Sequence, residues 1–282
     1  MEGEEILRQY ADGERNFREL NLKGINLKGV NLSDANFSRA NLQGANLSGA
    51  NLTGVNLREA KLIQIDLTEA NLTDANLIGS ELTGANLKFA NLSGANLRGT
   101  TARDINLSKT NLTEASLAEA NLTGANLFGA NLTDASLIRV TLIKANLSWS
   151  ILKGANLTNA NLSEAQLERA NITQAFLSGA TLIGANLSGA DLRQVTMMGA
   201  NLSEANLSQA NLRVTNISWS TLRGANLSGA NLYRAKLSWS NLSGAILLEA
   251  VLIDANLNRA NLRDADLRRA IMPNGSTYEP NH

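Results

Sequence analysis

The chain has 282 residues and a formal net charge of +0, because 25 Lys and Arg balance 25 Asp and Glu. This balance argues against a polyanion-binding surface and equally against an acidic protein that copies a nucleic acid. Cysteine is absent, which excludes disulfides and thiolate chemistry, and aromatic residues make up only 4%, so the core must be built from Leu, Ala, Ile and Val.

Residues 1–19 are expected to form an N-terminal cap with a short helix. On such a helix we expect Ile6, Leu7 and Tyr10 to lie on one side and cover the first layer of the segment that follows. The acidic start lacks a long apolar run, so we expect neither a secretory signal nor a membrane segment. We therefore expect a cytoplasmic protein.

A five-residue repeat fills residues 20–274 as one continuous domain, without insertion or deletion. Residues whose numbers end in 2 or 7 are mostly Leu. Those whose numbers end in 0 or 5 are mostly Ala, and those whose numbers end in 1 or 6 are mostly Asn. A helix would wind these Leu around its axis, and a flat strand would point them to alternate faces. A chain that turns by about 90° every five residues instead places every Leu and Ala inside.

The predicted fold is therefore an all-β, quadrilateral β-helix of coils with about 20 residues, stacked about 4.8 Å apart. Leu42, Leu47 and Leu52 are expected at the centre of the core. In residues 100–104 the central position is Ala102, and the loss of a buried Leu costs about 2–5 kcal/mol. This irregularity marks either a functional kink or drift in a fold with core to spare, and we favour drift.

In the predicted β-helix, residues 20 apart in the sequence lie one above the other on adjacent coils. Two faces of this β-helix carry candidate partner-binding residues. On one face, Trp219 and Trp239 are expected to be neighbours, with Phe176, Met198 and Ile138 on earlier coils. Such an exposed apolar cluster indicates either a partner site or side chains that merely cover the corners.

The second face is acidic in its first half and basic in its second half. It indicates either a polarised docking surface for a protein or ordinary solvated variation. Its residues are Asp34, Asp74, Glu114 and Asp134, followed by Lys153, Arg193, Arg213 and Arg234 with Tyr233.

The pattern resembles the pentapeptide repeat family through quintets such as "ANLSG" and "ANLTG" over about nine-tenths of the chain. The resemblance implies a right-handed quadrilateral β-helix. The opening "EEILRQYADGERNFREL" and closing "LRRAIMPNGS" resemble cyanobacterial members, including one linked to heterocyst differentiation. Relatives that inhibit DNA gyrase add a C-terminal dimerisation module. Residues 275–282 are expected to be an irregular tail without one, and we expect a monomer.

The sequence favours a non-enzymatic protein–protein interaction or regulatory scaffold, and the resemblance implies a setting in cyanobacterial cells. No catalytic, cofactor or metal site is expected, because Cys is absent and the only His is His282. The partner is expected to be a protein; nucleic acid and membrane are disfavoured. The alternatives are a DNA-mimicking topoisomerase protector, which needs a strongly acidic surface, and a purely structural repeat protein.

Overall fold

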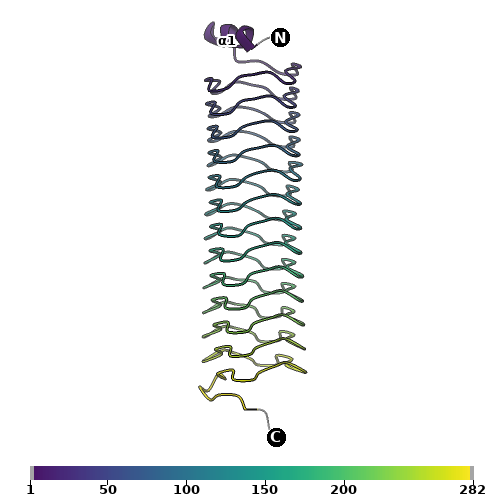
Figure 1. Cartoon of the computed structure of the whole chain (residues 1–282), viewed down its shortest axis with the longest axis vertical. Helices are drawn as coiled ribbons and strands as arrows, with labels where there is room; N and C mark the ends of the chain where they lie inside the picture. Colours follow the sequence, from purple (N-terminus) through teal and green to yellow (C-terminus); the bar gives the residue numbers. More distant parts are fainter. Residues whose placement is uncertain (1–2, 280–282) are drawn as a thin grey trace. The chain divides into compact units, whose positions relative to one another are not determined.

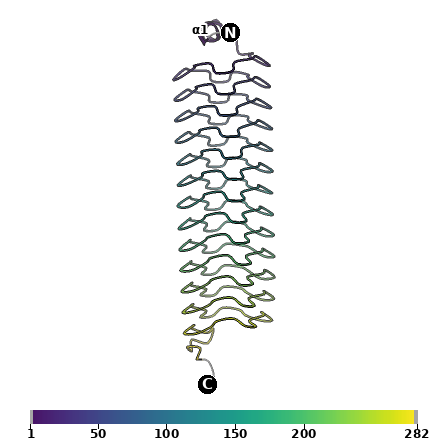
Figure 2. The same ribbon diagram turned by 45° about the vertical axis from the view of Figure 1, so that its right-hand side comes forward.

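The computed structural model describes residues 3–279, which fall into two compact units. Unit 1 is Met1–Thr141 and unit 2 is Leu142–His282. Within each unit the chain winds in successive coils that lie parallel to one another (Figures 1 and 2). No helix among the described residues has the length and apolar character needed to cross a membrane.

One helix, α1 (Gly3–Ala11), lies at the N-terminal end of unit 1 (Figure 1). Glu4 and Glu5 in its first turn and Arg8 in its last turn complement the helix dipole. Ile6 is fully buried, and the Tyr10 hydroxyl donates a hydrogen bond to the Ser33 carbonyl at 3.0 Å. The expected helix is therefore present and docks on the first coils.

The expectation that Leu7 covers the first coil together with Ile6 and Tyr10 is wrong, because the Leu7 side chain is 36% exposed. Consecutive residues on a helix lie about 100° apart, so Leu7 does not share a face with buried Ile6. The contact between α1 and the first coil therefore depends on Ile6 and Tyr10.

The coils are joined by single-residue parallel bridges between positions 20 apart. Unit 1 contains the bridges from Asn16↔Asn36 to Asn121↔Thr141, and unit 2 those from Asn146↔Gln166 to Val251↔Ile271. Bridges recur every five residues, which gives each 20-residue coil four sides. At one bridge, the Leu42 amide donates to the Lys61 carbonyl at 2.8 Å and the Lys61 amide donates to the Ala40 carbonyl at 2.9 Å.

The expected all-β fold is confirmed only in part, because residues 3–279 contain isolated single-residue bridges rather than extended strands. The two residues after each Leu form a turn, as in the 3.0 Å bond from the Ala45 amide to the Leu42 carbonyl. The second turn residue has a positive φ, with 65° at Gly44. A turn in every quintet leaves one residue per side free to pair.

Leu and Ala fill the interior of both units. Leu42, Leu47 and Leu52 are each at most 2% exposed, and Phe17 stacks on Phe37 with ring centroids 5.2 Å apart. Ala102 is also fully buried. The core is therefore aliphatic almost throughout, as the low aromatic content requires.

Asn is frequent at the bridge positions because its side chain bonds both along the chain and between coils. The Asn51 Oδ1 accepts a hydrogen bond from the Thr53 amide at 3.2 Å, which stabilises the turn. The Asn51 Nδ2 also donates to Asn31 Oδ1 on the neighbouring coil at 2.9 Å.

The chain folds back after the last coil of unit 2. Ile271 forms an antiparallel bridge with Thr277, and the Tyr278 amide donates to the Ala270 carbonyl at 2.7 Å. Residues 280–282 of the expected tail lie outside the described residues. The boundaries 1–19, 20–274 and 275–282 stay predictions.

Candidate functional site

Trp219, the most exposed apolar side chain among the described residues of unit 2, projects from the second turn position of its quintet, as Trp239 does. Trp219 and Trp239 both have φ of 63°, in the left-handed region that bulky side chains rarely adopt. In the same column, one and two coils before Trp219, the fold uses Gly199 and Gly179. Glycine adopts this conformation without steric cost, so the two Trp side chains are held at a position that does not favour them.

Trp219 and Trp239 form the centre of a surface that we call the aromatic face, which also includes Arg259, Met198 and Phe176. The ring centroids of the two Trp side chains are 4.9 Å apart and the ring planes differ by 7°. The Arg259 guanidinium lies 4.3 Å from the Trp239 ring centroid, on the next coil. Trp219 remains 60% exposed and Trp239 44% exposed, so stacking orders the two rings without burying them.

Two other predicted members of the aromatic face, Met198 and Phe176, are exposed but more dispersed, whereas Ile138 belongs to unit 1 and is half-buried. Met198 lies one coil before Ser218, and Phe176 lies two coils before Asn216. The structure therefore brings the two Trp together, with Met198 and Phe176 exposed on the preceding coils. Arg259 was not predicted, although its position 20 residues after Trp239 is a signal that could have found it.

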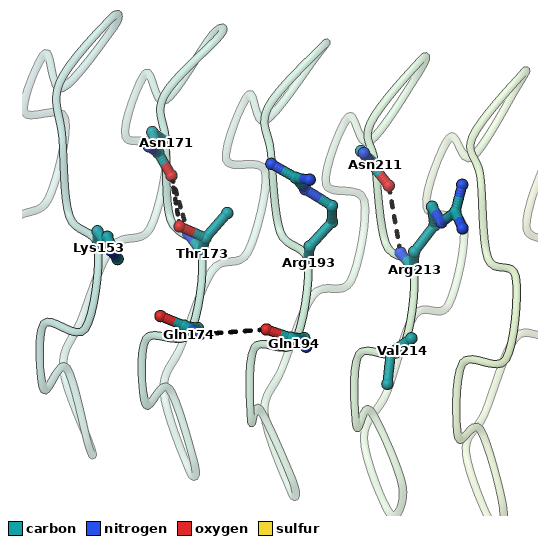
Figure 3. Close-up of a pocket in the computed structure, with 9 residues that line it drawn as sticks. All are labelled: Lys153, Asn171, Thr173, Gln174, Arg193, Gln194, Asn211, Arg213 and Val214. Carbon is teal, nitrogen blue, oxygen red and sulfur yellow. Dashed lines mark hydrogen bonds between the residues drawn. The ribbon is translucent and has the colours of Figure 1, made fainter.

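A hollow of about 690 Å³ opens on a different set of columns in unit 2, and we call it the basic groove. Figure 3 shows its side chains projecting from successive coils. The lining residues are Lys153, Asn171, Thr173, Gln174, Arg193, Gln194, Asn211, Arg213 and Val214.

The cations of the basic groove differ in how they are paired. The Arg193 guanidinium binds Asp191 through Nε at 2.9 Å and Nη2 at 2.6 Å, and this carboxylate raises the pKa of Arg193. Within unit 2, neither Lys153 nor Arg213 has a carboxylate within ion-pair distance. The groove thus carries two cations that no carboxylate of unit 2 compensates and one that Asp191 partly neutralises.

Tyr233, Arg213 and Arg234 lie together at one end of the groove. Both guanidinium groups lie over the Tyr233 ring, with their carbons 5.0 Å (Arg213) and 4.9 Å (Arg234) from its centroid. Arg234 also pairs with Asp254 at 3.3 Å. These cation–π contacts fix the direction of Arg213.

Sequence reasoning found the cations of the groove but not its neutral residues. Gln174, Gln194 and Val214 occupy one column, and their residue types gave no signal in the sequence. Only the 20-residue spacing could have associated them with Lys153 and Arg213.

The predicted acidic residues belong to unit 1. Asp34, Asp74, Glu114 and Asp134 are all exposed. The intervening residues at 53–54 and 93–94 are Thr-Gly and Ser-Gly, so this face of unit 1 has no basic residue between Asp34 and Asp134.

The described residues offer no arrangement for metal chemistry. Within residues 3–279, no group of three or more His, Cys, Asp or Glu side chains is placed to hold a metal ion. Several carboxylates pair instead with Arg, as Asp266 does with Arg268 at 2.7 Å, and this guanidinium lowers the pKa of Asp266.

Repeated 20-residue coils with inward Leu and Ala define a β-helical solenoid. The family described as "Pentapeptide repeats (8 copies)" matches residues 16–54, 50–88, 90–127, 120–159, 160–199, 200–238 and 235–272. The chain belongs to the pentapeptide repeat family, which implies that its coils form a right-handed β-helix. No relative was found among curated proteins.

Solved structures of the family include similar proteins. HetL, a pentapeptide repeat protein involved in heterocyst differentiation regulation from the cyanobacterium Nostoc sp. strain PCC 7120, is 34% identical. That match covers 99% of this chain and 100% of HetL, with a TM-score of 0.26.

Two further matches cover less of the chain. QnrB1, a plasmid-mediated fluoroquinolone resistance protein, is 18% identical over 68% of this chain and 90% of its own, with a TM-score of 0.45. A pentapeptide repeat protein from the Arabidopsis thaliana thylakoid lumen is 27% identical over 39% and 69%, with a TM-score of 0.27. All three TM-scores are below 0.5, and the family membership rests on the repeat.

Proposed function

We propose that this protein is a non-enzymatic scaffold that binds another protein through the aromatic face of unit 2. The observation that carries the proposal is the exposed Trp219–Trp239 stack, extended by Arg259. Trp and Arg are the residue types most enriched at the energetic centres of protein interfaces. Because adjacent coils fix both rings, a partner would bind them with little further loss of side-chain entropy.

The backbone at these positions supports the same proposal. A left-handed conformation costs a bulky residue about 1–2 kcal/mol, whereas Gly adopts it freely. Stacking returns about 0.5–1.5 kcal/mol for the pair beyond the burial of the rings. The fold therefore keeps two large side chains, 60% and 44% exposed, at positions that Gly would occupy without strain, which favours a role for them outside the fold.

The test compares the native chain with a Trp219→Gly/Trp239→Gly variant. Relief of the left-handed strain offsets part of the lost stacking and burial, so we expect the variant to fold, and thermal melts of both proteins check this. In affinity capture from lysate of the source organism, a specific partner should bind the native chain and be lost from the variant. Titration with that purified partner should then show a loss of about tenfold or more in affinity.

A matched control is Trp149→Gly. Trp149 is also exposed, has φ of 61°, and has Arg169 5.0 Å from its ring centroid. It lies in another column and has no stacked Trp partner. Partner binding should survive this substitution. If the double variant retains full affinity for every captured protein, the aromatic face is not the binding site.

A DNA-mimicking topoisomerase protector remains the second candidate, although the residues disfavour it. Bridge positions carry mainly neutral Asn, with acids at only a few, such as Asp66, Glu81, Asp191 and Asp266. A gyrase supercoiling assay separates the two functions, because the scaffold should leave supercoiling unchanged. A purely structural protein would instead tolerate every surface substitution.

The cellular setting is a further part of this proposal. We propose a regulatory role in a cyanobacterial cell, because the residues near both ends resemble cyanobacterial members of the family, and we further propose that the protein is a cytoplasmic monomer. Cell fractionation and light scattering of the purified protein test the location and the monomeric state. Deletion of the gene tests the regulatory role.

A further inference from the structure

We propose that the basic groove of unit 2 binds an acidic, extended polypeptide segment of a partner protein. This adds a second binding face to the proposed function, and it stands without the first. None of the groove residues belongs to the aromatic face.

The cations of the groove form a row that crosses successive coils, along the direction in which the coils stack. Lys153, Arg193 and Arg213 occupy the same position of their coils, with 40 and 20 residues between them. Three coil steps of about 4.8 Å separate the first from the last, or about 14 Å. An extended peptide of about four residues spans this length at about 3.3 Å per residue.

The donors needed to bind carboxylates are available. Lys153 and Arg213 are exposed and have no carboxylate partner within unit 2. Arg193 uses Nε and Nη2 for Asp191, and a guanidinium has further N–H donors on Nη1. Arg213 is held by the Tyr233 ring, which reduces the entropy lost when it binds an anion.

The neutral part of the groove suits a polypeptide backbone. Gln174 Nε2 donates to Gln194 Oε1 at 3.2 Å, so the two amides form a short ladder (Figure 3). The remaining amide donors and acceptors of such a ladder match the alternating N–H and C=O groups of an extended chain.

Val214 supplies an apolar contact at the end of this ladder. It is 48% exposed and has φ of 59°, a conformation that is a genuine outlier for a β-branched residue. The fold holds this side chain in the groove wall at a steric cost, where Gly occupies the equivalent position at Gly154.

The same features favour a polypeptide over nucleic acid. Single-stranded nucleic acids need a denser row of cations and aromatic faces on which bases stack. Here none of the described lining residues is aromatic. The nearby Tyr233 ring already carries the Arg213 and Arg234 guanidinium groups, and Asp191 partly neutralises Arg193. A few carboxylates match two uncompensated cations better than a row of phosphates does.

The test measures fluorescence anisotropy of a labelled peptide of about six residues in which Glu alternates with Ser. The native chain should bind it, with affinity that falls as salt is added. A Lys153→Gln/Arg213→Gln variant should bind about tenfold more weakly or worse, because it loses both cations that no carboxylate of unit 2 compensates. Both substituted side chains are exposed, and matching thermal melts establish that the variant is folded.

Two controls separate this inference from the aromatic site. The Trp219→Gly/Trp239→Gly variant should bind the acidic peptide as the native chain does, whatever happens to its other partner. A peptide with Gln in place of Glu should not bind. A Val214→Gly variant should melt no lower than the native chain but bind the peptide less tightly, because it keeps the charges and loses the apolar contact.

Several outcomes would overturn the inference. Equal binding of the Glu and Gln peptides would remove the charge argument, as would native affinity in the Lys153→Gln/Arg213→Gln variant. Tighter binding of a short oligothymidylate than of the peptide would assign the groove to nucleic acid. A dimer that dissociates in an Asp74→Asn/Glu114→Asn variant would assign it to the acidic face of a second copy.

Discussion

At the scale of single residues, the core of unit 1 contains two buried hydroxyls that find no partner. These are Ser80 Oγ and Thr100 Oγ1, which lie 20 residues apart at the inward small position and close to Ala102. Other inward hydroxyls are satisfied, as Thr110 Oγ1 is by the Leu87 carbonyl at 2.8 Å. The weakness of quintet 100–104 therefore comes from unpaired polarity as well as from the small central side chain.

Thr100→Val is expected to stabilise the protein. Val keeps the shape of Thr and removes a hydroxyl whose burial without a partner costs about 1–3 kcal/mol, so the free energy of unfolding should rise by about that amount. Chemical denaturation measures it. Thr110→Val is the matched control and should lower stability by about 1 kcal/mol, because it removes a hydrogen bond. Equal effects of the two substitutions would contradict this explanation.

At the scale of elements, α1 is held against the first coil at a point where only Gly fits. A Cβ added to Gly3 would lie 2.9 Å from the Asn26 carbonyl oxygen, closer than real Cβ contacts come. Buried Ile6 follows one turn later on the same helix. The close approach at Gly3 and the burial of Ile6 therefore act on the same contact.

Gly3→Ala should loosen α1, because Gly3 is the first residue of the helix, where the advantage that Ala has over Gly inside a helix does not apply. The added Cβ must push the helix from the coil, and we expect a loss of about 1–3 kcal/mol and faster trypsin cleavage after Arg8. Glu4→Ala, at an exposed position of the same turn, serves as the control and should leave both measurements nearly unchanged. A more stable Gly3→Ala protein would mean that helix propensity outweighs the contact.

The sequence predicted the coils well because their cause is periodic. A Leu every fifth residue excludes helix and strand, and one repeating contact then fixes every layer. It predicted the stacking of Trp219 on Trp239 for the same reason. It did not predict the single-residue bridges, since the turn length is set by backbone hydrogen bonds, nor the contact of Gln174 with Gln194, which depends on rotamers of neutral side chains.

At the scale of the whole chain, neutrality conceals a difference between the two units. Residues 1–141 contain 16 acidic and 13 basic residues, and residues 142–282 contain 9 and 12, so their net charges are −3 and +3. The basic groove lies in the positive unit. Overall charge alone therefore gave no indication of where an acidic partner would bind.

Stability should fall in acid. Hydrogen bonds from Arg39 and Arg58 lower the pKa of Glu59, and Arg139 and Arg98 lower that of Glu119, from an ordinary value of 4.5. A carboxylate with a lowered folded pKa stabilises the protein above its unfolded pKa. That contribution is lost as the pH falls through the folded pKa.

The melting temperature should thus stay level from about pH 7 to about pH 5 and decline below it. A Glu59→Gln/Glu119→Gln variant should show a shallower decline, and added salt should narrow the difference because both pairs are exposed. Parallel acid profiles for the variant and the native chain would show that these ion pairs do not contribute.

The bridges between residues 20 apart have a consequence for how such a gene can change in length. Adding four quintets inserts a whole coil and leaves every later side chain on its original side. Losing one quintet still leaves Leu and Ala inside, but it turns all later residues by a quarter of a circle and separates them from the columns before the deletion. Unequal recombination between near-identical repeats should therefore leave the fold intact. Only the gain or loss of whole coils keeps later side chains in the columns that form a binding surface, so partner binding limits which length changes are tolerated.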